Sequence, residues 1–454
     1  MPRAAAIAAW VTAALVSMTA SGAMPRREPP LILGGALPRP KAEVIVDPRL
    51  PTGARVGAAP RPTATASACS SRRPVCVHAF SQQGARLEAA LDALERAYER
   101  LVYALGMPAP LSDLGLGGTD ALDAYVGGEA LLVEADPPKL GPFTESSGWC
   151  ELPSVDGALL DRAATQCVGE AIALRLDASE PPHLRRAFAT WLWWLVGAPT
   201  SLDLEAIDLV QAHPERPIAS RELSAESEGD AMFFEYLESA RSTRPWGELS
   251  AALFGTAVSD NRKLGLYYDN EPDLFDVLRH SLNEERDRFA ALMVDFAVAR
   301  AFVGSRDDGL HLPNLAFSGD FGRVRYDWLV KFSTLPRRVL VNPPIDSTGA
   351  VVIWLDLDEV GLGAALGFHA DWEPPVSFHW QLVKVGPNGD EIARIDVPFQ
   401  ERGHEVDARL TNLDGASAIL IVGTNLEGID LSHPFDPDVS PFEPHGATVY
   451  VVRM

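Results

Sequence analysis

The most regular pattern of hydrophobic positions in the chain lies between residues 158 and 197 and predicts two helices joined by a short polar turn. Apolar residues of the first helix recur at the i, i+3, i+4 and i+7 spacing of one buried face: Leu160, Ala163, Ala164, Cys167, Val168, Ala171 and Ile172. The second helix begins after Pro181 and Pro182, and Trp193, Trp194 and Val196 make its end apolar nearly all round. Such a helix has to be enclosed by protein, so we expect the pair at the centre of the main domain.

Shorter patterns predict elements on both sides of this pair. Strands are expected at 75–80, 122–126 and 130–135. Amphipathic or apolar patterns predict further helices at 83–105, 223–240, 249–254, 274–282 and 284–302. From Arg337 onward at least six short β runs alternate with Gly, Pro, Asn and Asp. The predicted fold class is therefore α+β, with an α-rich domain at 74–335 and an antiparallel β-sandwich at 336–454.

The N-terminus predicts export. Residues 1–23 combine Arg3, a short apolar run and small residues at Ser21 and Ala23, the pattern of a secretory signal peptide cleaved after Ala23. Residues 24–73 are rich in Pro, Arg, Ala and Ser and predict a disordered basic linker or pro-segment. We expect a protein that is secreted, periplasmic or in the cell envelope, with no membrane span in the mature chain.

Charge and cysteines fit that compartment. The formal net charge of −23 argues against nucleic acid as a partner. Four cysteines allow three pairings, and we favour the local pairs Cys69–Cys76 and Cys150–Cys167 over a metal site, because a CxxC motif and a matched His pair are both absent from the sequence.

Several stretches together resemble a known family. They are VHAFSQQGARLEAALDALERAYERLVYALGMPAPLSDLGLGGTDALDAYV (77–126), the ATW of the second helix (189–191) and GDAMFFEYLE (229–238). With the order of the predicted elements, they make residues 75–300 similar to secreted zinc metallopeptidases of the gluzincin type known from myxobacteria. The resemblance implies a zinc-binding H-E-x-x-H helix followed by a helix that supplies a third, acidic ligand.

The resemblance identifies a degenerate member of that family. The corresponding pentapeptide is GEAIA, so Gly169 and Ala173 replace the histidines and Glu170 remains as a vestigial catalytic candidate. Arg186 stands near the position of the third ligand. Glu170 is interpreted either as the partner of Arg185 or Arg186 in an ion pair or as an ordinary surface glutamate.

Other patterns give weaker candidates. Asp113, Asp120 and Asp123 lie in a Gly-rich loop that does not match an EF-hand, and five scattered histidines lack ligand-spaced partners: His183, His213, His280, His311 and His369. Our hypothesis is a non-catalytic, metallopeptidase-like binding module that holds no cofactor and engages a protein or peptide. The alternatives are an active metal-dependent peptidase or hydrolase, holding zinc through other ligands, and a structural protein of the cell envelope.

Overall fold

The computed structural model describes residues 30, 31, 33, 60–79, 84–136, 145–218, 223–257, 263, 264, 267, 268, 272–282, 286–361, 363–374, 376–399, 403–426 and 444–454. The predicted signal peptide and nearly all of residues 24–59 lie outside this range. Within it, no helix is both long enough and apolar enough to cross a membrane.

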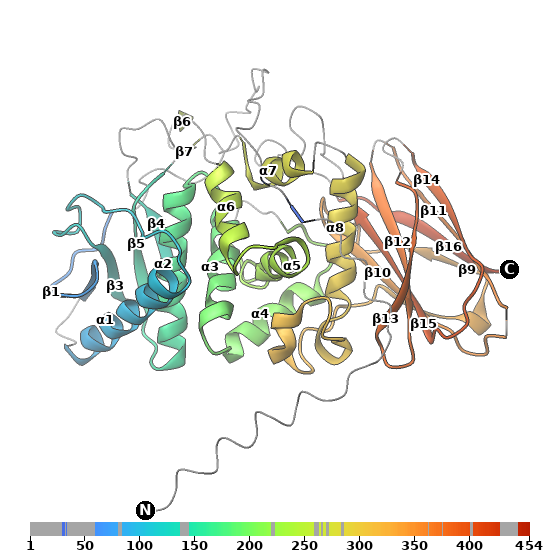
Figure 1. Cartoon of the computed structure of the whole chain (residues 1–454), viewed down its shortest axis with the longest axis horizontal. Coiled ribbons are helices and arrows are strands. Elements are labelled where there is room, and N and C mark those ends of the chain that lie inside the picture. Colours follow the sequence, from blue (N-terminus) through green and yellow to red (C-terminus); the bar gives the residue numbers. More distant parts are fainter. Residues whose placement is uncertain are drawn as a thin grey trace, which may run out of the picture.

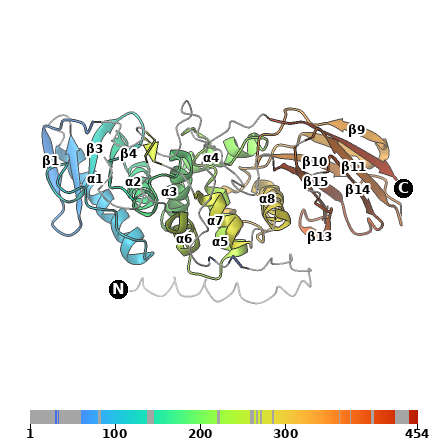
Figure 2. The same cartoon turned by 90° about the horizontal axis from the view of Figure 1, so that it is seen from above.

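A five-stranded mixed sheet forms one end of the molecule (Figures 1 and 2). Its strands are β1 (Ala66–Cys69), β2 (Val75–Ala79), β3 (Leu122–Gly128), β4 (Leu132–Ala135) and β5 (Gly148–Pro153), in the spatial order β1-β2-β3-β5-β4. The three central strands are parallel to one another, while β1 and β4 run antiparallel at the two edges. All five residues of β2 are buried, as expected for a strand covered on both faces.

Helices fill the centre of the molecule. They are α1 (Gly84–Tyr98), continued by a π-helical turn (Glu99–Ala104), α2 (Ala158–Leu176), α3 (Pro182–Val196), α4 (Ser201–Ala212), α5 (Ala231–Arg241), α6 (Glu248–Ala257), α7 (Leu274–Ser281) and α8 (Arg286–Arg300). Two-residue strands β6 (Lys263–Leu264) and β7 (Tyr267–Tyr268) pair after α6, and 3-10 turns η2 (Gly304–Arg306), η3 (Pro313–Ser318) and η4 (Phe332–Thr334) follow α8. The expected helix pair is α2 and α3, which lie between the sheet and helices α5 and α8, whereas α1 packs on the sheet side of α2 (Figure 1).

The other end of the molecule is a β-sandwich of two sheets. One has the order β13-β12-β15-β10-β8, and the other has the order β14-β11-β16-β9. The strands are β8 (Trp328–Lys331), β9 (Arg337–Leu340), β10 (Ala350–Asp356), β11 (Leu366–Trp372), β12 (Phe378–Val385), β13 (Glu391–Asp396), β14 (Glu405–Leu410), β15 (Ala418–Asn425) and β16 (Ala447–Arg453). The predicted α+β class with a C-terminal sandwich is confirmed, although β8 pairs with β10 in parallel.

Two elements lie outside their predicted domains. Strand β1 falls inside the segment 24–73 that we expected to be disordered, and β8 falls before the expected start of the sandwich at residue 336. Both are four-residue edge strands, and each is held by pairing with a neighbour: β1 with β2, and β8 with β10. The disulfide Cys69–Cys76 also ties β1 to β2, and Cys150–Cys167 ties β5 to α2; both predicted pairings are confirmed.

An apolar interface joins the helices to the sandwich. Val294, Val298 and Phe302, on and just beyond α8, pack with β10, β12 and β15 in one buried cluster. A buried charge cluster borders it. His311, stacked on Phe302 with 4.2 Å between ring centroids, lies 2.7 Å from Glu391 on β13 and 2.9 Å from Asp308. The helical part and the sandwich are therefore joined by both apolar packing and charge pairing.

Candidate functional site

Helices α2 and α3 approach each other closely at Gly169. A Cβ atom built on Gly169 would lie 2.9 Å from the Cβ of Ala189 and 3.0 Å from its Cα. Side-chain atoms do not come that close, so a larger residue at this position would push α3 away from α2. Position 169, which the resemblance assigned to a histidine, therefore faces the neighbouring helix.

Glu170 and Arg186 form a buried ion pair between the same two helices. The Nε of Arg186 donates to Glu170 Oε1, and the side chains are 7% and 2% exposed. The Nη2 of Arg186 also donates to the carbonyl oxygen of Leu131, 3.0 Å away, and its Nη1 lies 3.4 Å from Glu228 Oε1. Of the partners considered from the sequence, the structure selects Arg186; Arg185 donates to the backbone carbonyl of Glu180.

This ion pair belongs to a longer line of buried polar residues on α2. Arg162, Gln166 and Glu170 are spaced four residues apart and share one helix face, which we call the polar row. Arg162 Nε donates to Asp203 Oδ1 at 2.9 Å, and Gln166 Nε2 donates to Thr190 Oγ1 at 2.8 Å. Each buried polar group of the row therefore finds a partner on a neighbouring element.

Asp203 is the anchor of the polar row on α4. Its carboxylate accepts from the indole N–H groups of Trp193 and Trp194, each at 3.1 Å, and from the backbone and side chain of Thr200. Burial alone would raise the pKa of Asp203, but the Arg162 guanidinium and the hydrogen bonds from Thr200 outweigh it and lower that pKa. Asp203 is thus held as a carboxylate among tryptophans.

A buried serine, histidine and aspartate lie beside the row. Ser227 Oγ lies 2.9 Å from His183 Nδ1, and His183 Nε2 lies 2.6 Å from Asp230 Oδ2. The order of residues is that of a hydrolase triad, but the two ring nitrogens of His183 have exchanged partners, Ser227 is 0% exposed and its hydroxyl accepts the backbone N–H of Ser224. Ser227 therefore stabilises the turn that places Glu228 beside the polar row.

Zinc does not fit the residues at this place. Gly169 and Ala173 carry no donor atom, and the carboxylate of Glu170 is already paired with a guanidinium. A metal ion there would have to share a small buried space with the positive charge of Arg186. Among the residues that the structure describes, no group of three or more His, Cys, Asp or Glu side chains is arranged to hold a metal ion.

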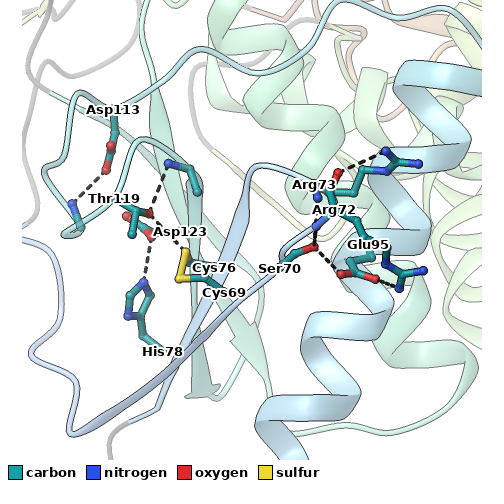
Figure 3. The surroundings of a disulfide bond; sticks show 12 residues. Cys69, Ser70, Arg72, Arg73, Cys76, His78, Glu95, Asp113, Thr119 and Asp123 are labelled. Carbon is teal, nitrogen blue, oxygen red and sulfur yellow. Dashed lines mark hydrogen bonds and ion pairs between the residues drawn. A yellow bond between two sulfur atoms is a disulfide. The ribbon is translucent and has the colours of Figure 1, made fainter.

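A second buried charge cluster lies at the sheet and involves the segment expected to be a linker. The guanidinium of Arg61 contacts Asp113 at 2.9 Å, Asp136 at 2.7 Å and Asp123, and Asp123 also lies 2.8 Å from His78. Figure 3 shows His78, Asp123 and Asp113 beside the disulfide Cys69–Cys76. Three aspartates that are almost fully buried are thus neutralised in part by one arginine from the N-terminal segment.

Within this cluster the pKa of one aspartate is raised and that of another is lowered. Burial raises the pKa of Asp113, and the hydrogen bonds that it accepts from two glycine amides do not fully offset the effect. Burial would also raise the pKa of Asp123, but the His78 hydrogen bond, the contact with Asp113 and the Arg61 charge outweigh it and lower that pKa. The loop aspartates considered from the sequence therefore form part of an internal charge cluster.

The sequence identified part of these sites and missed the rest. Glu170, Arg186, Gly169 and Ala173 lie together at the helix pair as expected. The partners of the polar row and most of the Arg61 cluster carried no local signal: Thr190, Asp203, Glu228, Arg61 and Asp136. Arg162 and Gln166 were also missed, although their four-residue spacing with Glu170 was an available clue.

Comparison with known proteins identifies no family. No model of a known protein family matches the chain, and no curated protein matches it. Among solved structures, the pre-peptidase C-terminal domain of a collagenase from Bacillus anthracis matches with 10% identity and a TM-score of 0.18, covering 28% of this chain and 96% of that domain. The enzymatically active domain of tailspike protein 4 of bacteriophage CBA120 matches with 14% identity and a TM-score of 0.17, covering 26% of this chain and 18% of that one. Scores this low do not establish a shared fold.

Proposed function

We propose that the protein is a non-catalytic, metallopeptidase-like module that acts outside the cytoplasm by binding a protein or peptide. The observation that carries the proposal is the ion pair of Glu170 with Arg186. Glu170 stands where the family that the chain resembles has its general base, and here its carboxylate is paired with the guanidinium of Arg186. The close approach of Gly169 to Ala189 adds to this, because a histidine side chain at position 169 would not fit between the helices.

Two further features support the proposal. A mixed sheet packs against α2 through β4 and β5, so the helix pair has a sheet on one side, an arrangement compatible with a metallopeptidase-like framework. All four cysteines of the chain are paired, which suits an oxidising compartment and therefore export. Ion pairs fill the interior between the helices, so we expect the partner to bind at the surface of the protein.

Metal content and peptide hydrolysis together test the proposal. We expect the purified protein to contain zinc at far below one ion per chain, and to cleave a fluorescent peptide library at the same background rate with and without a chelator. The variants Glu170→Gln and Glu88→Gln should behave alike in this assay, because Glu88 is an exposed residue of α1.

One zinc ion per chain, with hydrolysis that the chelator abolishes and that Glu170→Gln but not Glu88→Gln removes, would establish the alternative of an active metallopeptidase. Hydrolysis that persists in Glu170→Gln but depends on metal would place the ligands elsewhere in the chain. Either result refutes the non-catalytic assignment.

A further inference from the structure

Two arginines and two aromatic rings gather where the sandwich meets the helices. Arg306, Arg323, Tyr326 and Trp354 form what we call the arginine–aromatic cluster. The guanidinium carbon of Arg306 lies 3.6 Å from the ring centroid of Trp354 and 5.4 Å from that of Tyr326. That of Arg323 lies 5.1 Å from the same tyrosine ring, and the two rings stack at 5.5 Å. Two positive charges therefore share one aromatic platform.

The platform itself is fixed by the fold. Trp354 belongs to β10, and both aromatic rings pack against the apolar cluster between α8 and the sandwich. Arg306 ends the 3-10 turn η2, which follows α8. Figure 1 shows α8 and β10 next to each other in this part of the molecule. The guanidinium of Arg306 is thus held against the face of Trp354.

No carboxylate among the described residues neutralises this pair of arginines. Asp307 accepts the backbone N–H two residues further along at 2.7 Å, and Asp327 accepts from Arg325 at 3.0 Å. Burial lowers the pKa of Arg306, and the like charge of Arg323 adds to that effect. In a chain whose net charge is −23, two adjacent arginines without a carboxylate are unexpected.

The cluster also holds donors that lack an acceptor. The Nε of Arg306 is shielded from solvent and has no hydrogen-bond acceptor within the described part of the chain. The hydroxyl of Tyr326 lies near both guanidiniums, which can donate to its oxygen, but its own proton has no acceptor there. Guanidinium groups only donate, so neither arginine can accept the proton of the tyrosine hydroxyl. Buried donors of this kind are normally satisfied by an acceptor oxygen, and beside two guanidiniums an oxygen that carries negative charge binds most strongly.

We propose that the arginine–aromatic cluster is a binding site for an oxyanion, the carboxylate, sulfate or phosphate group of a ligand. Two guanidiniums supply both the charge and the N–H donors that such a group requires, and the aromatic platform holds them in place. The site lies away from Glu170 and does not depend on the function proposed above.

Titration with simple anions tests this site. Purified full-length protein is titrated with sodium phosphate, sodium sulfate or sodium acetate at constant ionic strength set with sodium chloride, and heat and tryptophan fluorescence are recorded. We expect saturable one-site binding of at least one anion. Preference for phosphate and sulfate would identify a tetrahedral group as the ligand, and preference for acetate would identify a carboxylate.

Substitutions locate the binding. Arg306→Gln and Arg323→Gln should each weaken the anion about tenfold, since a hydrogen bond to a charged group contributes on that scale. Arg338→Gln is the matched control, because exposed Arg338 lies 5.6 Å from the ring of Tyr450 on the other sheet without a second arginine over that ring. Its binding should equal that of the parent.

Three results would overturn the site. They are the absence of saturation with all three anions, equal weakening by Arg338→Gln and Arg323→Gln, and unchanged binding in Arg323→Gln. Arg323 is exposed, so its substitution should leave the melting temperature unchanged and give an answer even if Arg306→Gln fails to fold.

Discussion

Removing the guanidinium of Arg186 should destabilise the protein strongly. In Arg186→Met the apolar stem remains, but Glu170, 2% exposed, loses its charged partner and the carbonyl of Leu131 loses its donor. A hydrogen bond to a charged group contributes about 2 kcal/mol and one to a neutral carbonyl about 1 kcal/mol. The sum, about 3 kcal/mol, lies at the lower end of the 3–5 kcal/mol that loss of one partner of a buried ion pair typically costs.

A second substitution isolates the charge. If the cost comes from a carboxylate left buried without a partner, then Glu170→Met in the same chain should recover about 2 kcal/mol of it, because an apolar pair of similar size has no charge to desolvate. Arg96→Met is the matched control. Arg96 pairs with Asp161 between α1 and α2 at 2.6 Å, but its side chain is 46% exposed, so its loss should cost under about 1 kcal/mol.

Urea unfolding of the purified full chain, followed by circular dichroism and tryptophan fluorescence, measures these differences. Coincidence of the two signals is required before a free energy of unfolding is assigned. The reasoning is refuted if Arg186→Met is no more destabilising than Arg96→Met. It is refuted equally if the double variant is less stable than Arg186→Met alone.

Two further predictions concern the other charge clusters. Arg61→Ala should lower the melting temperature by several degrees, because it leaves three buried aspartates without their guanidinium. Arg72→Ala, at a side chain that is 67% exposed, should change the melting temperature little. Equal shifts in the two variants would contradict the role of Arg61. His311 and Glu391 should give a stability maximum between about pH 4.5 and 6.5, measured as melting temperature against pH. Burial would lower the pKa of His311, but its bonds to Asp308 and Glu391 raise it above 6.5, so this contribution is complete below pH 6.5 and is lost as the pH rises through the higher value. Burial would raise the pKa of Glu391, but His311 and a neighbouring arginine lower it from 4.5 to about 2, so its contribution is present above pH 4.5 and is lost as the pH falls toward 2. His311→Gln should flatten the alkaline side of the profile, and an unchanged profile would exclude His311 as the titrating group.

Local patterns predicted the elements whose burial repeats along the chain. The faces of α2 and α3, the buried strand β2 and the strands of the sandwich follow from hydrophobic periodicity, and both disulfides join cysteines that are close in sequence. The edge strands β1 and β8 did not follow. Each has four residues, and pairing with a neighbouring strand decides such short segments more than their own propensity does.

Separation along the sequence decides which contacts of the site could be predicted. Glu170 and Arg186 are 16 residues apart on consecutive helices, so their meeting could be anticipated. Arg61 and Asp136 are 75 residues apart, and His183 and Asp230 are 47 apart. Contacts of that separation depend on the packing of whole elements, which no local spacing encodes.

Three enclosed arginines share one arrangement, and the arginine–aromatic cluster lacks it. Arg61, Arg162 and Arg186 are each nearly enclosed, and each is held by carboxylates from other segments. These carboxylates offset the cost of desolvating the three guanidiniums, whereas Arg300, which is also buried, donates to Gln211 Oε1 and to the carbonyl of Val210 instead. At Arg306 and Arg323 the chain supplies no such carboxylate among the described residues, although Asp307 and Asp327 are close in sequence. Arginines that stabilise a fold are paired internally; two that stack on aromatic rings beside unsatisfied donors are arranged as they would be to meet a charge brought from outside.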